Sequence, residues 1–212
     1  MSTAAEPLDR PALLRRGLRL EYITVGWNIV EGIVAIGAGL AAGSVALIGF
    51  GLDSFVESGS GSVLIWRLGA EWRGDRNAEQ IARVERRAEL LVGIAFLVLA
   101  AYVALAAIAS LLALAEPEGS PVGMALTAAS IGVMVWLANA KRRTGQALDS
   151  RALIADSKQT YACVYLSVVT LAGVALNAVF GWWWADPLAA IGIAILLVRE
   201  GIEAVRGEGD DG

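Results

Sequence analysis

The stretch SVALIGFGLDSFVESGSGS, residues 44–62, lies inside an apolar segment that is too long and too poor in turn residues to be a loop. It nevertheless carries two acids, Asp53 and Glu57, four residues apart. On a helix this spacing places both carboxylates on one face, about one turn apart. Two acids on one face of a membrane-buried helix are costly unless they hold a cation or a proton. The stretch therefore predicts a transmembrane helix that carries a cation site.

The composition of the whole chain is also that of a membrane protein. Of its 212 residues, 57% are hydrophobic, and the mean hydropathy of +0.61 is too high for an ordinary soluble domain. One cysteine, Cys163, and no histidine exclude a disulfide framework, a cysteine-rich metal site and a histidine metal site. The net charge of −4 gives no sign of a nucleic-acid partner. The sequence shows no nucleophile–base arrangement, so an enzyme is not expected.

Six apolar segments are predicted to span the membrane, which takes about 20 residues per helix. Polar or glycine- and proline-containing connections separate them, and the sixth reaches this length only if it continues to residue 204. The sequence therefore predicts an all-α membrane protein with a polar N-terminal tail (1–17), a six-helix transmembrane domain (18–205) and a short disordered tail (206–212). The expected spans are about 20–42, 45–66, 89–115, 122–140, 153–180 and 187–204.

The basic residues predict the orientation of these spans. All 17 Lys and Arg residues lie before the first span, between the second and third, between the fourth and fifth or at the start of the fifth, and at the end of the chain. With six spans, these regions fall on one side of the membrane, and cytoplasmic loops carry an excess of Lys and Arg. We therefore expect both termini in the cytoplasm and a multi-pass protein of the cell (inner) membrane.

The fifth predicted span carries a second polar face. A gapless alignment of the second span with the fifth pairs Asp53 with Gln159 and Glu57 with Cys163, although a match this short also arises by chance. If the two faces meet, two carboxylates, an amide oxygen and a thiolate form a four-ligand site of a kind that zinc and similar ions accept. The alternatives remain open: protonated acids that join helices, an interhelical hydrogen bond for Gln159, and a small apolar filler for Cys163.

These two segments resemble the transport motifs of the cation diffusion facilitator family, whose members have six spans and cytoplasmic termini. An Asp-Pro pair, residues 186–187, also opens the sixth span as in many members. The usual metal site is built from Asp and His, and this chain departs from it at Glu57, Gln159 and Cys163. The matching motif residues are Ser44, Ala46, Leu47, Asp53, Ser54 and Glu57 in the second span and Ala155, Asp156, Gln159 and Cys163 in the fifth.

The resemblance implies a divalent metal cation transporter with Asp53, Glu57, Gln159 and Cys163 as metal ligands. It further implies export from the cytoplasm in exchange for protons, by alternating access. Zinc is the first expectation because a thiolate with oxygen ligands suits a borderline ion, while iron, manganese, cobalt, nickel and cadmium stay open. A homodimer formed through the membrane helices is implied, without the cytoplasmic domain in which the family usually ends.

Other buried polar residues have open roles. Glu31 and Asn28 share a face of the first span and are candidates for a secondary ligand or a proton carrier. Asp156 is expected either to cap the fifth helix or to help admit the ion. Asp186 is expected mainly to cap the sixth helix, with proline in its first turn.

Two other functions also remain open from the sequence. One is a proton-coupled carrier of a small organic cation, which would need a larger, aromatic-lined cavity. The other is a non-transporting membrane subunit that keeps the fold. Metal binding by the purified protein separates both from a metal transporter.

Overall fold

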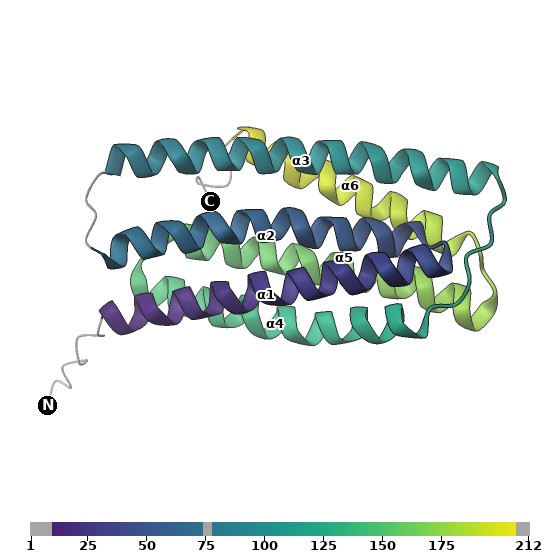
Figure 1. Ribbon diagram of the computed structural model, residues 1–212, viewed down its shortest axis with the longest axis horizontal. Helices are drawn as coiled ribbons and strands as arrows, with labels where there is room; N and C mark the ends of the chain where they lie inside the picture. The colour runs from purple at the N-terminus through teal and green to yellow at the C-terminus, as the bar shows by residue number, and fades with distance from the viewer. Residues whose placement is uncertain (1–9, 74–77, 207–212) are drawn as a thin grey trace, which may run out of the picture.

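The computed structural model describes residues 10–73 and 78–206, and these residues form helices joined by short connections (Figure 1). Successive helices run in opposite directions along the long axis of the molecule. The predicted tails fall largely outside the described residues, although α1 begins at Arg10, inside the segment expected to be a tail. The helices are α1 (Arg10–Ala42), α2 (Val45–Trp72), α3 (Ala78–Leu112), α4 (Pro121–Leu148), α5 (Arg151–Phe180) and α6 (Ala185–Arg206).

Local sequence signals explain where several helices begin and end. Ser44, Ser120 and Ser150 precede α2, α4 and α5, and each serine side chain accepts a hydrogen bond from the backbone N–H three residues on. This contact satisfies one of the free N–H groups of a helix N-terminus. Gly43 and Gly181 follow α1 and α5 at φ values of 68° and 67°, where a residue without a Cβ is least strained.

The surface and the interior have the polarity of a membrane protein. Among the described residues, four helical segments are long and apolar enough to cross a membrane, whereas α2 and α6 do not reach that threshold. The buried polar side chains include acids of α1 and α2, so the interior of the bundle is more polar than its sides. The all-helical prediction is confirmed. The four segments are Arg10–Ala42, Arg86–Leu112, Pro121–Leu148 and Arg151–Phe180.

Helices α1, α2, α4 and α5 form one group, and α3 packs with α6 beside it (Figure 1). Glycine pairs bring the helix backbones close together. A Cβ atom on Gly32 of α1 would lie 3.0 Å from the carbonyl oxygen of Gly51 on α2, and one on Gly93 of α3 would lie 2.9 Å from that of Gly201 on α6. Small residues at these crossings permit the tight packing that membrane helices need.

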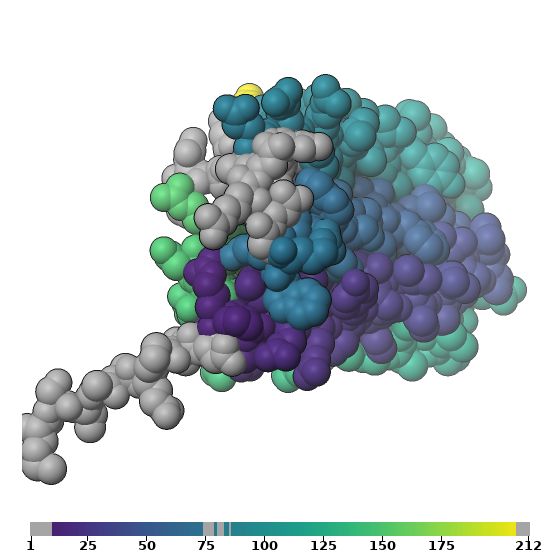
Figure 2. Space-filling view, turned by 60° about the vertical axis from the view of Figure 1, so that its left-hand side comes forward, coloured from purple at the N-terminus to yellow at the C-terminus, as the bar shows by residue number. Residues whose placement is uncertain are grey.

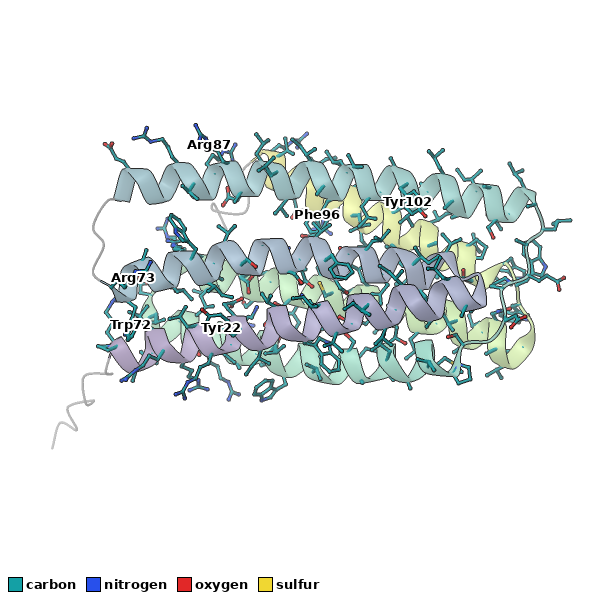
Figure 3. The ribbon with its side chains drawn as sticks, in the orientation of Figure 1. Tyr22, Trp72, Arg73, Arg87, Phe96 and Tyr102 are labelled. Carbon is teal, nitrogen blue, oxygen red and sulfur yellow. The ribbon has the colours of Figure 1, made fainter. Side chains whose placement is uncertain are left out.

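The ends of the helices that adjoin the basic connections gather at one end of the molecule (Figure 2). Arg10 of α1 pairs with Glu71 of α2 there and also donates to the carbonyl of Leu148 at the end of α4. Figure 3 shows Arg73 and Arg87 at the same end. We call this the basic end. Inside the four-helix group, this end contains a buried apolar cluster: Leu14, Leu64, Leu68, Leu148 and Leu153.

Candidate metal centre

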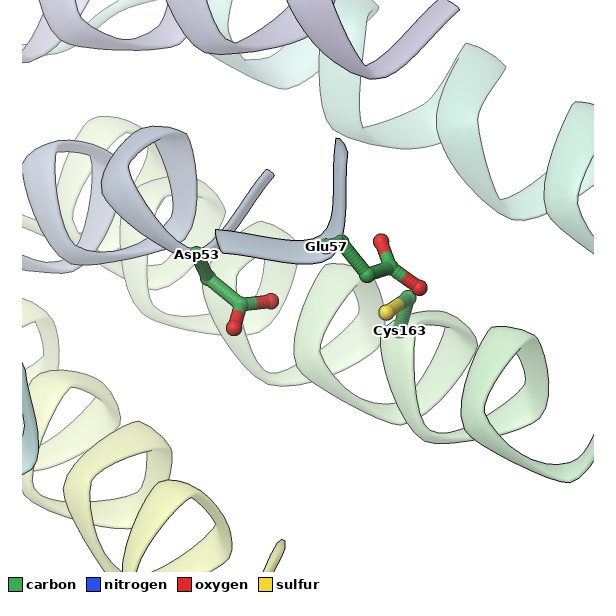
Figure 4. Close-up of side chains that lie close together, drawn as sticks. All are labelled: Asp53, Glu57 and Cys163. Atoms are coloured by element: carbon green, nitrogen blue, oxygen red, sulfur yellow. The ribbon is translucent and has the colours of Figure 1, made fainter. Parts of the chain in front are cut away.

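Helix α2 carries both acids of the predicted site into the interior. Asp53 is 2% exposed and Glu57 is 7% exposed, and an uninterrupted helix keeps them one turn apart on the same face. On α5, the thiol of Cys163 is buried as well. The ligand atoms of these three residues all lie within 4.8 Å of one another. Figure 4 shows the Cys163 sulfur beside the Glu57 carboxylate, with Asp53 pointing into the same space. We call this group the candidate metal centre.

Asn28 holds the Glu57 carboxylate in place. Its Nδ2 donates a hydrogen bond of 2.9 Å to Glu57 Oε2, and both side chains are buried. The Oδ1 atom of Asn28 is buried without a hydrogen-bond partner among the described residues. Asn28 is therefore a neutral group that orients Glu57 from α1 and adds no positive charge beside that carboxylate.

Gln159 lies one turn before Cys163 on the same helix. Its Oε1 accepts a hydrogen bond of 3.4 Å from Ser60 of α2, and its Nε2 is buried without a partner among the described residues. The structure thus brings three of the predicted ligands together. It places the fourth, Gln159, one turn away on α5, where it contacts α2 through Ser60. Whether Gln159 or a water molecule completes the coordination stays a proposal.

Glu31 is a third buried acid and approaches α2 from α1. Ser54, the neighbour of Asp53, donates to Glu31 Oε2 at 3.4 Å. The other carboxylate oxygen, Oε1, is buried and without a partner among the described residues. This position beside the acidic pair keeps Glu31 a candidate for a secondary ligand or a proton carrier.

The prediction that Asp156 caps α5 is wrong, because Ser150 is the capping residue and Asp156 lies inside the helix. Asp156 accepts a hydrogen bond from Lys141 Nζ, and Glu21 Oε2 accepts another from the same ammonium at 3.0 Å. This pairing was not predicted, because Lys141 directly follows the expected fourth span (122–140) and so falls in a polar connection. The helical spacing of α4 could have indicated that Lys141 is buried, since it follows the buried Leu137 by four residues and so shares its face.

Asp186 caps a different helix from the one expected. Helix α6 begins at Ala185, so Asp186 lies in its first turn. Its carboxylate accepts hydrogen bonds from the Ser44 hydroxyl and from the backbone N–H of Val45 at 2.9 Å, both at the start of α2. Asp186 is therefore a buried acid whose charge faces the N-terminus of a neighbouring helix.

The candidate metal centre combines two carboxylates and one thiol in a buried space. Carboxylate oxygens with a sulfur form a mixed hard and soft ligand set, which suits divalent ions of borderline character. Three protein ligands leave a fourth tetrahedral position for an amide oxygen or water. The chemistry that this arrangement supports is reversible binding of a divalent cation.

Comparison with known proteins places the chain in a family. Residues 22–208 match the family model described as the cation efflux transmembrane domain. The chain is similar to an uncharacterized transporter of Synechocystis sp., with 30% identity over 190 residues, which are 87% of this chain and 60% of that protein. It is also similar to the cation-efflux pump FieF of Shewanella oneidensis, with 27% identity over 130 residues, 61% of this chain and 42% of that pump. The chain therefore spans less than two thirds of either relative.

Proposed function

Because the chain belongs to the cation efflux family, the cation diffusion facilitators that its motifs resemble, we propose that it moves a divalent metal cation across a membrane. The observation that carries the proposal is the cluster of Asp53, Glu57 and Cys163, buried between α2 and α5 with ligand atoms within 4.8 Å. Buried acids in a membrane helix are costly unless a cation or proton neutralises them. A transported cation meets that requirement.

Zinc is the ion that the proposed ligands favour. Two carboxylates, the Cys163 thiolate and the Gln159 amide oxygen would give a borderline ion four ligands of mixed hardness. Iron(II), manganese, cobalt, nickel and cadmium are the competitors. The carboxylates and the thiol must lose their protons to bind metal, so metal and protons compete for the same groups. We propose that this competition couples cation export to proton uptake.

The proposed transport route uses six membrane spans and alternating access. Helices α2 and α6 run alongside the four strongly apolar helices over the same depth (Figure 1), and this supports counting them as spans. With six spans, the basic end faces the cytoplasm and so do both termini. Rocking of the helix groups against each other would then expose the candidate metal centre to either side in turn.

A second copy of the chain is proposed to pack on α3. Every seventh residue of one α3 face is a strongly exposed leucine or valine, with exposed fractions of 65% to 81%. A repeat of seven is the spacing at which two long helices keep one seam in contact. The four residues of this face are Leu91, Val98, Leu105 and Leu112.

Binding and transport measurements test the proposal together. Calorimetry on the purified protein with zinc, iron(II) and manganese should show one saturable site, with weaker binding as the pH falls. Vesicles containing the protein should then take up the ion that binds most tightly. A protein that binds none of these ions would be a carrier of another cation or a non-transporting subunit. Binding without uptake would favour the subunit alone.

A further inference from the structure

A second buried group of charges lies where α1, α4 and α5 meet. The ammonium of Lys141 contacts Glu21 Oε2 at 3.0 Å, Thr160 Oγ1 at 3.3 Å and the carboxylate of Asp156. The side chains of Lys141 and Glu21 are 1% and 0% exposed, and that of Asp156 is 12% exposed. We call Glu21, Lys141, Asp156 and Thr160 the Lys141 cluster.

The charges of the Lys141 cluster do not balance. Two carboxylates face one ammonium, and the three N–H donors of that ammonium are already matched by three oxygen acceptors. Glu21 Oε1 is buried without a hydrogen-bond partner among the described residues. A net negative charge and an unmatched carboxylate oxygen are both costly in a membrane interior. A single proton removes the net negative charge and makes the unmatched oxygen part of a neutral carboxyl group.

No second cation approaches Glu21 from the helices around it in the described contacts. On α2, Gly61 faces Glu21, and a Cβ added to this glycine would lie 3.7 Å from Glu21 Oε2. The next charged group along α2 is Glu57, one turn away and also negative. From α4, Lys141 contacts Glu21, and from α5, Asp156 contacts the same ammonium.

We propose that the Lys141 cluster binds one proton in addition to those of its own ammonium, on the buried carboxylate of Glu21, and so forms a second proton- and cation-responsive site beside the candidate metal centre. Asp156 is the member that retains exposure, and it is the sixth residue of α5, near the basic end. The proton leaves to water on that side and returns from it.

The register of the helices places the Lys141 cluster next to the candidate metal centre. Glu21 precedes Asn28 by seven residues on α1, and Asp156 precedes Cys163 by seven on α5. Seven residues are two turns, or about 10 Å along a helix. At this separation in a medium of low dielectric, a divalent cation at the centre favours loss of the proton from Glu21. This coupling rests on the proposed function, whereas the presence of the proton does not.

Infrared spectroscopy in the absence of metal tests the proton directly. A protonated carboxyl gives a carbonyl absorption that a carboxylate lacks. Glu21→Gln and Asp156→Asn should each remove one carboxylic acid equivalent at neutral pH, because either change leaves a balanced pair with Lys141. Lys141→Met should add one equivalent, since two buried acids then lack a counter-charge. Arg142→Met, an exposed neighbour on α4, should change nothing.

The proposal of a bound proton is overturned if Glu21→Gln and Asp156→Asn both show the same carboxylic acid absorption as the wild-type protein. Both variants keep one ion pair with Lys141, so at least one is expected to fold. The coupling is tested by calorimetry with zinc in buffers of different protonation enthalpy. Glu21→Gln should release up to one proton fewer per bound zinc. An unchanged proton count would overturn the coupling, and a wild-type protein that binds no metal would instead remove the proposed function.

Discussion

The candidate metal centre and the Lys141 cluster are both buried, both use α5 and both contain two acids, but they differ in what balances those acids. In the Lys141 cluster, an ammonium of the same chain contacts Glu21 and Asp156. In the candidate metal centre, the partner that contacts Glu57 from α1 is the neutral amide of Asn28. An internal counter-charge holds helices together, whereas we propose that the acids without one bind an ion that arrives from outside.

Asp186 provides a third case of a buried acid. Backbone N–H groups at the start of α2 and the Ser44 hydroxyl surround its carboxylate, so the positive end of a helix balances the charge. The molecule thus stabilises buried carboxylates in two ways that need no ion, by an ammonium and by a helix N-terminus. The acids of the candidate metal centre have neither among the described contacts, and this contrast leads to four predictions.

The largest effect is expected from Asp53→Ala. This change removes one of the two carboxylates of the candidate metal centre, and metal uptake into reconstituted vesicles should fall to the level of empty vesicles. Ser60→Ala is the matched control on the same helix, because it removes only the 3.4 Å contact with Gln159 and should retain most of the uptake. If the Asp53→Ala variant took up metal as fast as the wild-type protein, the metal site could not lie on α2.

Lys141→Met should destabilise the fold by about 3–5 kcal/mol, since it leaves buried acids without their counter-charge. Protonation at lower pH neutralises those acids in the folded state, so the deficit in unfolding temperature should shrink as the pH falls. Thermal unfolding in detergent at several pH values measures both effects. A deficit that is independent of pH, or equal to that of Arg142→Met, would mean that the ammonium does not balance Glu21 and Asp156.

Asp186→Ala should cost about 1–2 kcal/mol of stability by removing the acceptor of the Val45 and Ala46 N–H groups at the start of α2. Asp186→Asn should cost less, because the amide keeps one acceptor oxygen for the Val45 N–H. Metal affinity should be the same for both variants, since Asp186 acts at the end of α2 rather than at the site. A large loss of affinity at unchanged stability would show that Asp186 belongs to the transport site.

The smallest effect is expected from Cys163→Ser. Replacing sulfur by oxygen makes the ligand set harder, so the affinity ratio of zinc or cadmium to manganese should shift toward manganese. We expect a shift of roughly tenfold, about 1.4 kcal/mol. Competition calorimetry measures the ratio directly. An unaltered ratio would indicate that the thiol only packs between α2 and α5.

Much of the architecture followed from patterns within single segments. Length and hydropathy predicted helices at each position where the structure has one, and the spacing of Asp53 and Glu57 placed them on one face of α2. The motif resemblance singled out Cys163, which does lie beside Glu57. These predictions succeeded because helical periodicity and the cost of burying charge act locally along the chain.

The predictions that failed concerned contacts between helices. Lys141 begins a run of three basic residues, so its sequence neighbours suggested a solvated connector. Asp186 stands before proline at a helix start, so it suggested a cap for its own helix. In both cases the true partner lies far away in the sequence, on α1 and α5 for Lys141 and at the start of α2 for Asp186.

The sequence by itself therefore determined that this protein is an all-helical member of the cation efflux family with acids buried in its second helix. Only the tertiary structure decided how each buried acid is balanced. The physical reason is that helical phase shows which residues turn inward, whereas charge balance depends on which inward faces meet. Glu21 and Glu57 both turn inward, and the partner helix gives one an ammonium and leaves the other for an ion.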